Sequence, residues 1–279
     1  MTTEVSKKPS DLKTRVTTGV IGGAGLVLWI VYGGRFGVAI LAAVISLFML
    51  WEYGKMVFAL SDAGVKRVAA LVVAWIMHFI FFWIPGMQLG FFVALFLGCF
   101  AYFLFSAEKH RDHLEAHFRE ASYFFFGLIY LGYLPIYFVS LRETVNGIHW
   151  TMLSLLIVWA GDTGGYFAGR AYGKRKLYEL ISPKKTVEGA IGGLTLGLVV
   201  TIVYKLTFFN ALRWDGVVLI PLVVGSVAAI GDLCESFLKR SFATKDSGSI
   251  LPGHGGFLDR FDGVVFSLPV AYACMKIWG

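Results

Sequence analysis

The sequence "VVGSVAAIGDLCESFLKR", from Val223 to Arg240, decides the fold class of this chain. It begins as a run of apolar and small residues and ends with two acids followed by two basic residues. An Asp at the centre of a membrane helix costs about 2.5 to 3.5 kcal/mol on insertion scales. The stretch therefore predicts a transmembrane helix whose acids have a role beneath the membrane surface.

Apolar runs of similar length recur along all 279 residues. The sequence is 57% hydrophobic and 15% charged, whereas soluble domains carry about 25% charged residues. The runs have the roughly 17 to 25 residues that cross a bilayer as a helix, and the alternation typical of a membrane β-barrel is missing from the sequence. We therefore predict an all-α, polytopic integral membrane protein.

We predict about nine transmembrane helices. They cover residues 16–33, 36–53, 68–84, 89–106, 121–140, 150–168, 188–208, 216–237 and 260–278. The polar tail, 1–15, leads into an apolar run without a convincing small-residue cleavage site, so the first span is expected to be retained. An N-terminal transmembrane region (16–149) then precedes a C-terminal catalytic region (150–279) with cytoplasmic loops at 169–187 and 238–259.

The basic residues predict the orientation of these spans. With the N-terminus inside, the tail and the cytoplasmic loops hold most of the 25 Lys and Arg residues. Cytoplasmic loops retain positive charge, so the pattern predicts a cytoplasmic N-terminus and an outside C-terminus in the cell membrane. The net charge of +7 suits anionic headgroups and anionic ligands. Nucleic acid is not an expected partner, because no basic surface domain with interleaved aromatic residues is found in the sequence.

Acids enter the predicted membrane region at two places. Asp162 lies in "LLIVWAGDTGGYFAGR", and Asp232 lies in the opening stretch. At about 1.5 Å per residue, they lie about 10 Å and 12 Å from the ends of their helices. This similar depth favours one shared, water-accessible cavity, although a structural hydrogen bond would also explain an isolated acid.

Helical spacing places several polar side chains on one face. Asp232, Glu235, Ser236 and Lys239 fall at i, i+3, i+4 and i+7. Asp259 and Asp262 form another i, i+3 pair at the start of the last span. Hard oxygen ligands from separate elements suit Mg²⁺, which usually binds one or two carboxylates together with substrate phosphates. The pattern therefore predicts a phosphate-bearing substrate.

The segment "AGRAYGKRKLYELISPKKTVEGAIGG", 168–193, is strongly basic and leads into a predicted helix. Backbone N–H groups at the helix start, together with Lys184 and Lys185, are suited to hold a polyphosphate. Ordinary positive-inside charge is the alternative explanation for this segment. A Walker phosphate loop is excluded, because the required glycine and lysine spacing is missing.

The stretch "SFLKRSFATKDSGSILPGHGGFLDRFD", from Ser236 to Asp262, resembles the signature of phosphatidate cytidylyltransferases, also called CDP-diacylglycerol synthases. The matching positions are Ser236, Lys239, Arg240, Lys245, Asp246, His254, Gly255, Gly256, Asp259, Arg260 and Asp262. The segments "GDTGGYFAGR" and "SPKKTVEG" are also similar to motifs of that family. The resemblance covers the chain from about Trp159 onward, whereas the first five spans share only their hydrophobicity.

This resemblance implies transfer of a cytidylyl group from CTP to phosphatidate, giving CDP-diacylglycerol and pyrophosphate, with Mg²⁺ required. It implies metal ligation by Asp232 and Asp259, and it is compatible with a second, monovalent cation such as K⁺. Asp162 and Asp262 are our further candidates for metal ligands. The catalytic candidates are Asp232, Asp259, Lys239 and Asp246. The substrate-binding candidates are Lys184, Lys185, Ser236, Arg240, Lys245, His254, Gly255, Gly256 and Arg260.

Other polar residues are interpreted as structural. His110, His113 and His117 are spaced along an expected interfacial helix that also carries apolar residues, so a metal role is not favoured. Glu52 and His78 are expected to be satisfied structural groups. Glycines at four-residue spacing, such as those in "GAIGGLTLG", allow close helix contact, either in a homodimer or within one chain.

Three other functions stay open. A CTP-dependent polyprenol or phytol kinase would need similar basic loops and Mg²⁺, but it would transfer the γ-phosphate. An ion-coupled transporter also buries acids, yet transporters tend to carry broken helices in repeated halves, and the acids here cluster in the C-terminal half. A non-catalytic lipid-binding membrane protein would require a site that has lost its activity.

Overall fold

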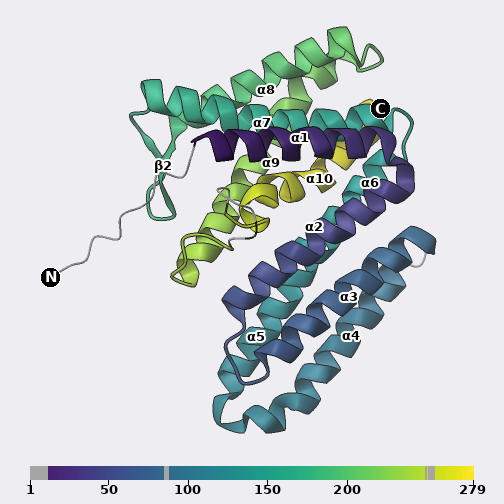
Figure 1. Ribbon diagram of the computed structural model, residues 1–279, viewed down its shortest axis with the longest axis vertical. Helices are drawn as coiled ribbons and strands as arrows, with labels where there is room; N and C mark the ends of the chain where they lie inside the picture. Colours follow the sequence, from purple (N-terminus) through teal and green to yellow (C-terminus); the bar gives the residue numbers. More distant parts are fainter. Residues whose placement is uncertain (1–11, 85–87, 249, 251–254) are drawn as a thin grey trace, which may run out of the picture.

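The computed structural model describes residues 12–84, 88–248, 250 and 255–279, and these are mostly helical (Figure 1). The α-helices are α1 (Leu12–Tyr32), α2 (Gly34–Val57), α3 (Ala63–Trp83), α4 (Gln88–Ser106), α5 (Leu114–Gly127), α6 (Tyr137–Arg142), α7 (Gly147–Tyr172), α8 (Val187–Thr207), α9 (Trp214–Ser241) and α10 (Leu258–Trp278). Each predicted span falls on a helical segment. The number of membrane crossings stays a prediction.

The fifth predicted span, 121–140, is an interrupted helix. After α5 the chain forms a π-helical turn at Leu128–Tyr133 and a 3-10 turn at Leu134–Ile136 before α6 begins. Pro135 lies in the 3-10 turn, and a proline has no backbone N–H to continue an α-helical ladder. A 3-10 turn at Ala107–His113 likewise joins α4 to α5.

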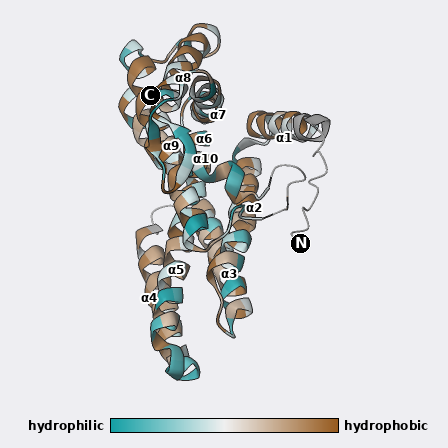
Figure 2. Ribbon diagram, turned by 90° about the vertical axis from the view of Figure 1, so that its left-hand side faces the viewer, coloured by the Kyte–Doolittle hydropathy of each residue, from teal (hydrophilic) through white to brown (hydrophobic). Residues whose placement is uncertain are grey.

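The apolar helices support a polytopic membrane protein. Six segments of the described chain are long and apolar enough to cross a membrane: Gly34–Val57, Ala63–Trp83, Leu89–Arg142, Val187–Thr207, Trp214–Ser241 and Leu258–Trp278. Hydrophobic residues dominate these helices in Figure 2. The helix α7 is not among the six, because Asp162 and several glycines lower its mean hydropathy.

The basic loop between α7 and α8 contains a small hairpin. Strand β1 (Lys176–Tyr178) pairs antiparallel with β2 (Ser182–Thr186). We expected only a cytoplasmic loop here, because strands this short leave little alternation in the sequence. The hairpin leads directly into α8, where the Thr186 hydroxyl caps the helix by accepting a 3.1 Å hydrogen bond from Gly189 N.

Glycines bring α7 and α8 into backbone contact. A Cβ atom built on Gly164 would lie 2.6 Å from Gly192 O, and one on Gly193 would lie 2.6 Å from Gly161 O. Such distances exclude larger side chains at these positions without a shift of the helices. The glycine stripe of α8 is therefore used for packing within this chain.

Two hydrophobic clusters connect the N-terminal and C-terminal regions. One joins Ile30 and Val38 to apolar residues of α7, α9 and α10. The other joins residues of α2 to α5 with Leu258 and Val265 of α10. Figure 1 shows α3, α4 and α5 extending away from the group formed by α7 to α10. The helices α2 and α10 contribute to both clusters and therefore connect the two groups.

Candidate active site

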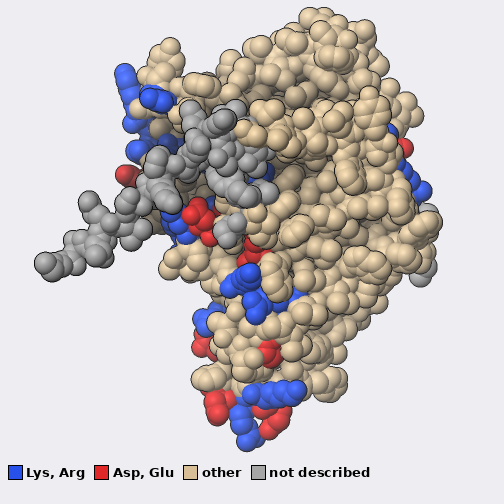
Figure 3. Space-filling view, in the orientation of Figure 1, with Lys and Arg blue, Asp and Glu red and all other residues tan. Residues whose placement is uncertain are grey.

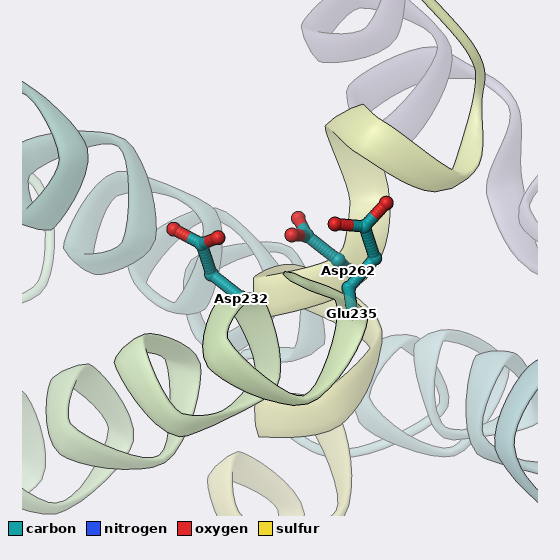
Figure 4. A group of neighbouring side chains, drawn as sticks. All are labelled: Asp232, Glu235 and Asp262. Carbon is teal, nitrogen blue, oxygen red and sulfur yellow. The ribbon is translucent and has the colours of Figure 1, made fainter. Parts of the chain in front are cut away.

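Three carboxylates converge between α9 and α10. Asp232 and Glu235 extend from α9 and Asp262 extends from α10, and one oxygen from each lies within 4.8 Å of the others (Figure 4). The i, i+3 spacing puts the first two on the same face of α9. Gly231 allows the helices to approach, since a Cβ there would lie 3.0 Å from Asp262 O.

Glu235 is the most buried of the three acids, with 1% of its side chain exposed. Its Oε2 lies 2.6 Å from Lys239 Nζ, whereas its Oε1 is buried without a hydrogen-bond partner among the described residues. A buried carboxylate oxygen without a partner is costly and calls for an ion or an ordered water. The sequence placed Glu235 on the polar face, but our candidate ligands did not include it.

Asp259 connects Lys239 to the segment between α9 and α10. Its Oδ1 accepts a 2.6 Å hydrogen bond from Lys239 Nζ. Its Oδ2 accepts from Ser247 N at 3.0 Å, from Ser247 Oγ at 2.9 Å and from Gly256 N at 2.9 Å. In this arrangement the two Asp259 oxygens accept hydrogen bonds from Lys239 and from the loop residues Ser247 and Gly256. The catalytic and metal-binding roles expected of Asp259 stay predictions.

The predicted glycines lie directly against Asp259. Gly255 has φ of +82°, a left-handed conformation that glycine adopts without strain. A Cβ at Gly255 would lie 2.9 Å from Asp259 Oδ2. The glycine therefore permits both the turn and the close approach of the loop to the carboxylate.

A 480 Å³ pocket between α7, α8 and α9 adjoins the carboxylates. Asp162 and Asp232 both line it, which confirms the predicted shared cavity. Lys184 and Lys185 line the same pocket, and Lys185 forms an ion pair with Asp232. Its other lining residues are mostly apolar or small, including Ile157, Val158, Leu194, Ile230 and Leu233. The pocket thus combines a charged part with an apolar part.

The remaining candidates lie around this centre. Ser236 is half-buried on α9, whereas Arg240, Lys245 and Asp246 are exposed at the end of α9 and just after it. Arg260 is exposed on the first turn of α10. His254 lies outside the described residues. Figure 3 shows Lys and Arg gathered on the left and lower parts of one face, while its broad upper part is mostly uncharged.

Two residues that we did not predict complete the loop contacts. Glu52 of α2 accepts a 3.0 Å hydrogen bond from Leu258 N, and its Oε2 lies 3.2 Å from Ser247 Oγ, whose proton it shares with Asp259. Asp162 was chosen as a candidate because it is an acid within an apolar run. Glu52 is also an acid within an apolar run, so the same criterion could have identified it. Ser247 directly follows Asp246 in the signature, but its hydroxyl alone gave no reason to choose it.

Two of the three spaced histidines, His110 of the α4–α5 connection and His117 of α5, form part of a separate buried cluster. Their rings stack with centroids 4.5 Å apart, whereas His113 is exposed. His110 also lies 3.1 Å from Asp62. Burial alone would raise the pKa of Asp62, but hydrogen bonds from Lys66 and His110 outweigh this and lower the pKa.

The chain matches a known family over nearly its whole length. The model described as "Cytidylyltransferase family" matches residues 13–278. The chain belongs to the cytidylyltransferase family. This match extends the resemblance that we saw from Trp159 onward to the N-terminal helices as well.

Curated relatives are identical to this chain at about a third of the aligned residues. The phosphatidate cytidylyltransferase of Bacillus subtilis (strain 168) is 33% identical over 274 residues, which cover 96% of this chain and 99% of the relative. That of Staphylococcus aureus (strain COL) is 34% identical over 264 residues, covering 93% and 97%. That of Staphylococcus haemolyticus is 36% identical over 217 residues, covering 77% and 80%.

Proposed function

We propose that this protein is a phosphatidate cytidylyltransferase that transfers a cytidylyl group from CTP to phosphatidate. The products are CDP-diacylglycerol, used in phospholipid biosynthesis, and pyrophosphate. The observation that carries the proposal is the cluster of three carboxylates beside a pocket with charged and apolar parts. Membership of the cytidylyltransferase family and the printed names of the relatives support the same reaction.

The pocket suits one end of a lipid. Binding sites combine apolar walls with a few placed polar groups that orient the ligand. Lys184 and Lys185 would face the phosphates, and the N-terminus of α8 adds backbone N–H groups beside Thr186. The apolar residues on the other walls would contact the hydrocarbon part of phosphatidate.

The reaction needs positioning and charge neutralisation more than proton transfer. An oxygen of the lipid phosphate attacks the α-phosphorus of CTP in line. The bond between the α-phosphorus and the oxygen that bridges it to the β-phosphorus breaks, and pyrophosphate leaves. The attacking oxygen is already anionic, so it needs no general base. Lys185 and Lys239 would neutralise charge that develops on the phosphates.

The donor set supports an Mg²⁺ site. Asp232, Glu235 and Asp262 supply hard oxygens within 4.8 Å of one another, and one oxygen of Glu235 is buried without a described partner. These residues would hold the ion, with Asp162 on the wall of the adjoining pocket. Bound Mg²⁺ would supply charge neutralisation at phosphate oxygens. Ligation by Asp259, and a second cation such as K⁺, stay predictions from the resemblance.

The membrane arrangement follows the basic residues. We propose nine crossings of the cell membrane, with a cytoplasmic N-terminus, an outside C-terminus and an active site that opens to the cytoplasm. The position of the basic hairpin segment beside the pocket supports this orientation. A homodimer stays a prediction, and it would need a surface other than the glycines that pack α8 against α7.

The test uses purified protein in detergent with phosphatidate, Mg²⁺ and CTP labelled separately at the α- and γ-phosphates. The proposal predicts that the α label enters the lipid and that pyrophosphate is released. Entry of the γ label would instead identify a lipid kinase. Failure of both labels to enter, under conditions in which the Bacillus subtilis relative transfers the α label, would contradict the proposal.

A further inference from the structure

We infer that Glu52 of α2 is a positioning residue that anchors both described ends of the α9–α10 connection, at Ser247 and at Leu258. The inference rests on the proposed function for its kinetic consequences. Through Glu52, the N-terminal region would directly position part of the C-terminal site. From the sequence, Glu52 was expected only to be a satisfied structural group.

The contacts of Glu52 are specific to this connection. Only 2% of the residue is exposed. Its Oε2 accepts a hydrogen bond from Leu258 N and shares the single Ser247 hydroxyl proton with Asp259 Oδ2. Burying a carboxylate in an apolar helix is costly unless hydrogen bonds compensate. These donors stabilise one oxygen of Glu52 inside α2, whereas its Oε1 is buried without a hydrogen-bond partner among the described residues. Glu52 in turn contacts two points that lie eleven residues apart in the sequence.

Two glycines of the connection pack directly on this carboxylate. A Cβ atom on Gly248 would lie 2.6 Å from Glu52 Cδ, and one on Gly256 would lie 2.8 Å from the same atom. Any residue with a side chain at either position would require the Glu52 carboxylate to move. The backbone therefore closes around Glu52 from both ends of the connection.

Hydrogen bonds and an ion pair continue from Glu52 to the carboxylate cluster. Ser247 Oγ lies 3.2 Å from Glu52 and 2.9 Å from Asp259 Oδ2. Asp259 and Glu235 each lie 2.6 Å from Lys239 Nζ. A shift of the Ser247 end would consequently alter the orientation of Asp259 and Lys239 beside the cluster.

The experiment compares Glu52→Ala and Glu52→Gln with Ser46→Ala, a matched control on the same helix. Ser46 is fully buried and donates a 2.6 Å hydrogen bond to Leu131 O, away from the connection. Hydrogen exchange is measured by mass spectrometry on intact protein in detergent, for peptides containing residues 255–258. Steady-state kinetics then separate kcat from KM for CTP.

Glu52→Ala is expected to speed exchange of these amides about tenfold and to lower kcat/KM for CTP about tenfold. The reason is the loss of the Leu258 hydrogen bond and of the shared Ser247 hydrogen bond to a buried acceptor. Glu52→Gln keeps one acceptor oxygen in place, so it should restore both values to within about threefold. Ser46→Ala should leave both within about twofold of wild type, because the hydrogen bond that it removes, to Leu131 O, lies outside the described part of the connection.

Unchanged exchange and kinetics in Glu52→Ala would overturn the inference, as would an equal loss in Ser46→Ala. A Gln variant as impaired as the Ala variant would also overturn it, because hydrogen-bond anchoring would not be the cause. If Glu52→Ala does not fold, Ser247→Ala removes the hydroxyl that contacts both Glu52 and Asp259. It is expected to speed the same exchange about threefold; no change would overturn the inference. Exchange needs no substrate, so failure of cytidylyl transfer in the wild type would count against the proposed function only.

Discussion

The molecule contains two buried polar clusters of similar composition, one in each region. In the N-terminal cluster, Lys66 Nζ lies 2.7 Å from Asp62 and 2.6 Å from Glu120. Glu120 also accepts hydrogen bonds from the backbone of the turn before α3. The charged groups of this cluster are paired with one another, as expected of a structural group.

The C-terminal cluster is different because acids outnumber their basic partners. Asp232, Glu235 and Asp262 converge, and one Glu235 oxygen has no described partner. A 480 Å³ pocket also adjoins this cluster. The comparison teaches that buried charge alone does not mark a candidate site, whereas an excess of one charge beside a cavity does.

Replacing Asp232 by Asn should have the largest effect on turnover. The variant keeps the size of the side chain but removes a charged oxygen ligand from the cluster and the ion pair with Lys185. We expect kcat to fall about a thousandfold, equivalent to about 4 kcal/mol of lost transition-state stabilisation. The α-label transfer assay measures the loss, and an unchanged elution profile in detergent checks folding. Activity near that of wild type would remove Asp232 from the site.

Replacing Lys185 by Met should have an intermediate effect. The variant removes a cation that pairs with Asp232 and lines the pocket. A charge-assisted hydrogen bond contributes about 1.5 to 3 kcal/mol, so we expect kcat/KM to fall roughly tenfold to a hundredfold. Initial rates over a range of CTP and phosphatidate concentrations would show which substrate is affected. Unchanged values for both substrates would contradict the phosphate contact.

Replacing Lys66 by Met should affect stability much more than catalysis. Breaking a buried ion pair by removing one partner costs about 3 to 5 kcal/mol. We therefore expect a lower Tm, while the specific activity of the folded fraction stays within about twofold at low temperature. Thermal unfolding followed by size-exclusion fluorescence measures the first quantity. A selective loss of activity without a change in Tm would show that this cluster is not merely structural.

Replacing His113 by Ala should have the smallest effect. This histidine is exposed at the end of the 3-10 turn, whereas His110 and His117 are buried in the N-terminal cluster. Surface substitutions of this kind usually change stability by less than about 0.5 kcal/mol. The label-transfer rate and the Tm should both match those of wild type. A large loss of either would show that the α4–α5 connection contributes to the reaction.

The sequence predicted those features that depend on local patterns. Hydropathy located the helices, and helical spacing put Asp232 and Glu235 on one face. The hairpin before α8 was missed because its strands are too short to give a pattern. The interruption at Leu128–Ile136 was missed because hydropathy stays high through the run, although Pro135 is a sequence signal for a break in an α-helix.

Contacts between distant segments could not be predicted from one sequence. Glu52 and Leu258 are 206 residues apart along the chain, and no spacing rule connects them. The backbone and lysine partners of Asp259 depend in the same way on how α9, α10 and their connection fold together. The resemblance therefore identified the segment from Ser236 to Asp262 as functional. The packing of α2 against that segment was found only in the structure.

The most direct test of the difference between the two clusters is binding of Mn²⁺, used as a probe for Mg²⁺, followed by electron paramagnetic resonance. Wild type, Glu235→Gln and Lys66→Met are titrated without nucleotide or lipid, so the result does not depend on activity. We predict that wild type and Lys66→Met bind alike and that Glu235→Gln binds at least about tenfold more weakly, as expected for the loss of a charged ligand. Equal binding by Glu235→Gln, or weakened binding by Lys66→Met alone, would contradict the assignment of the metal site to the C-terminal cluster.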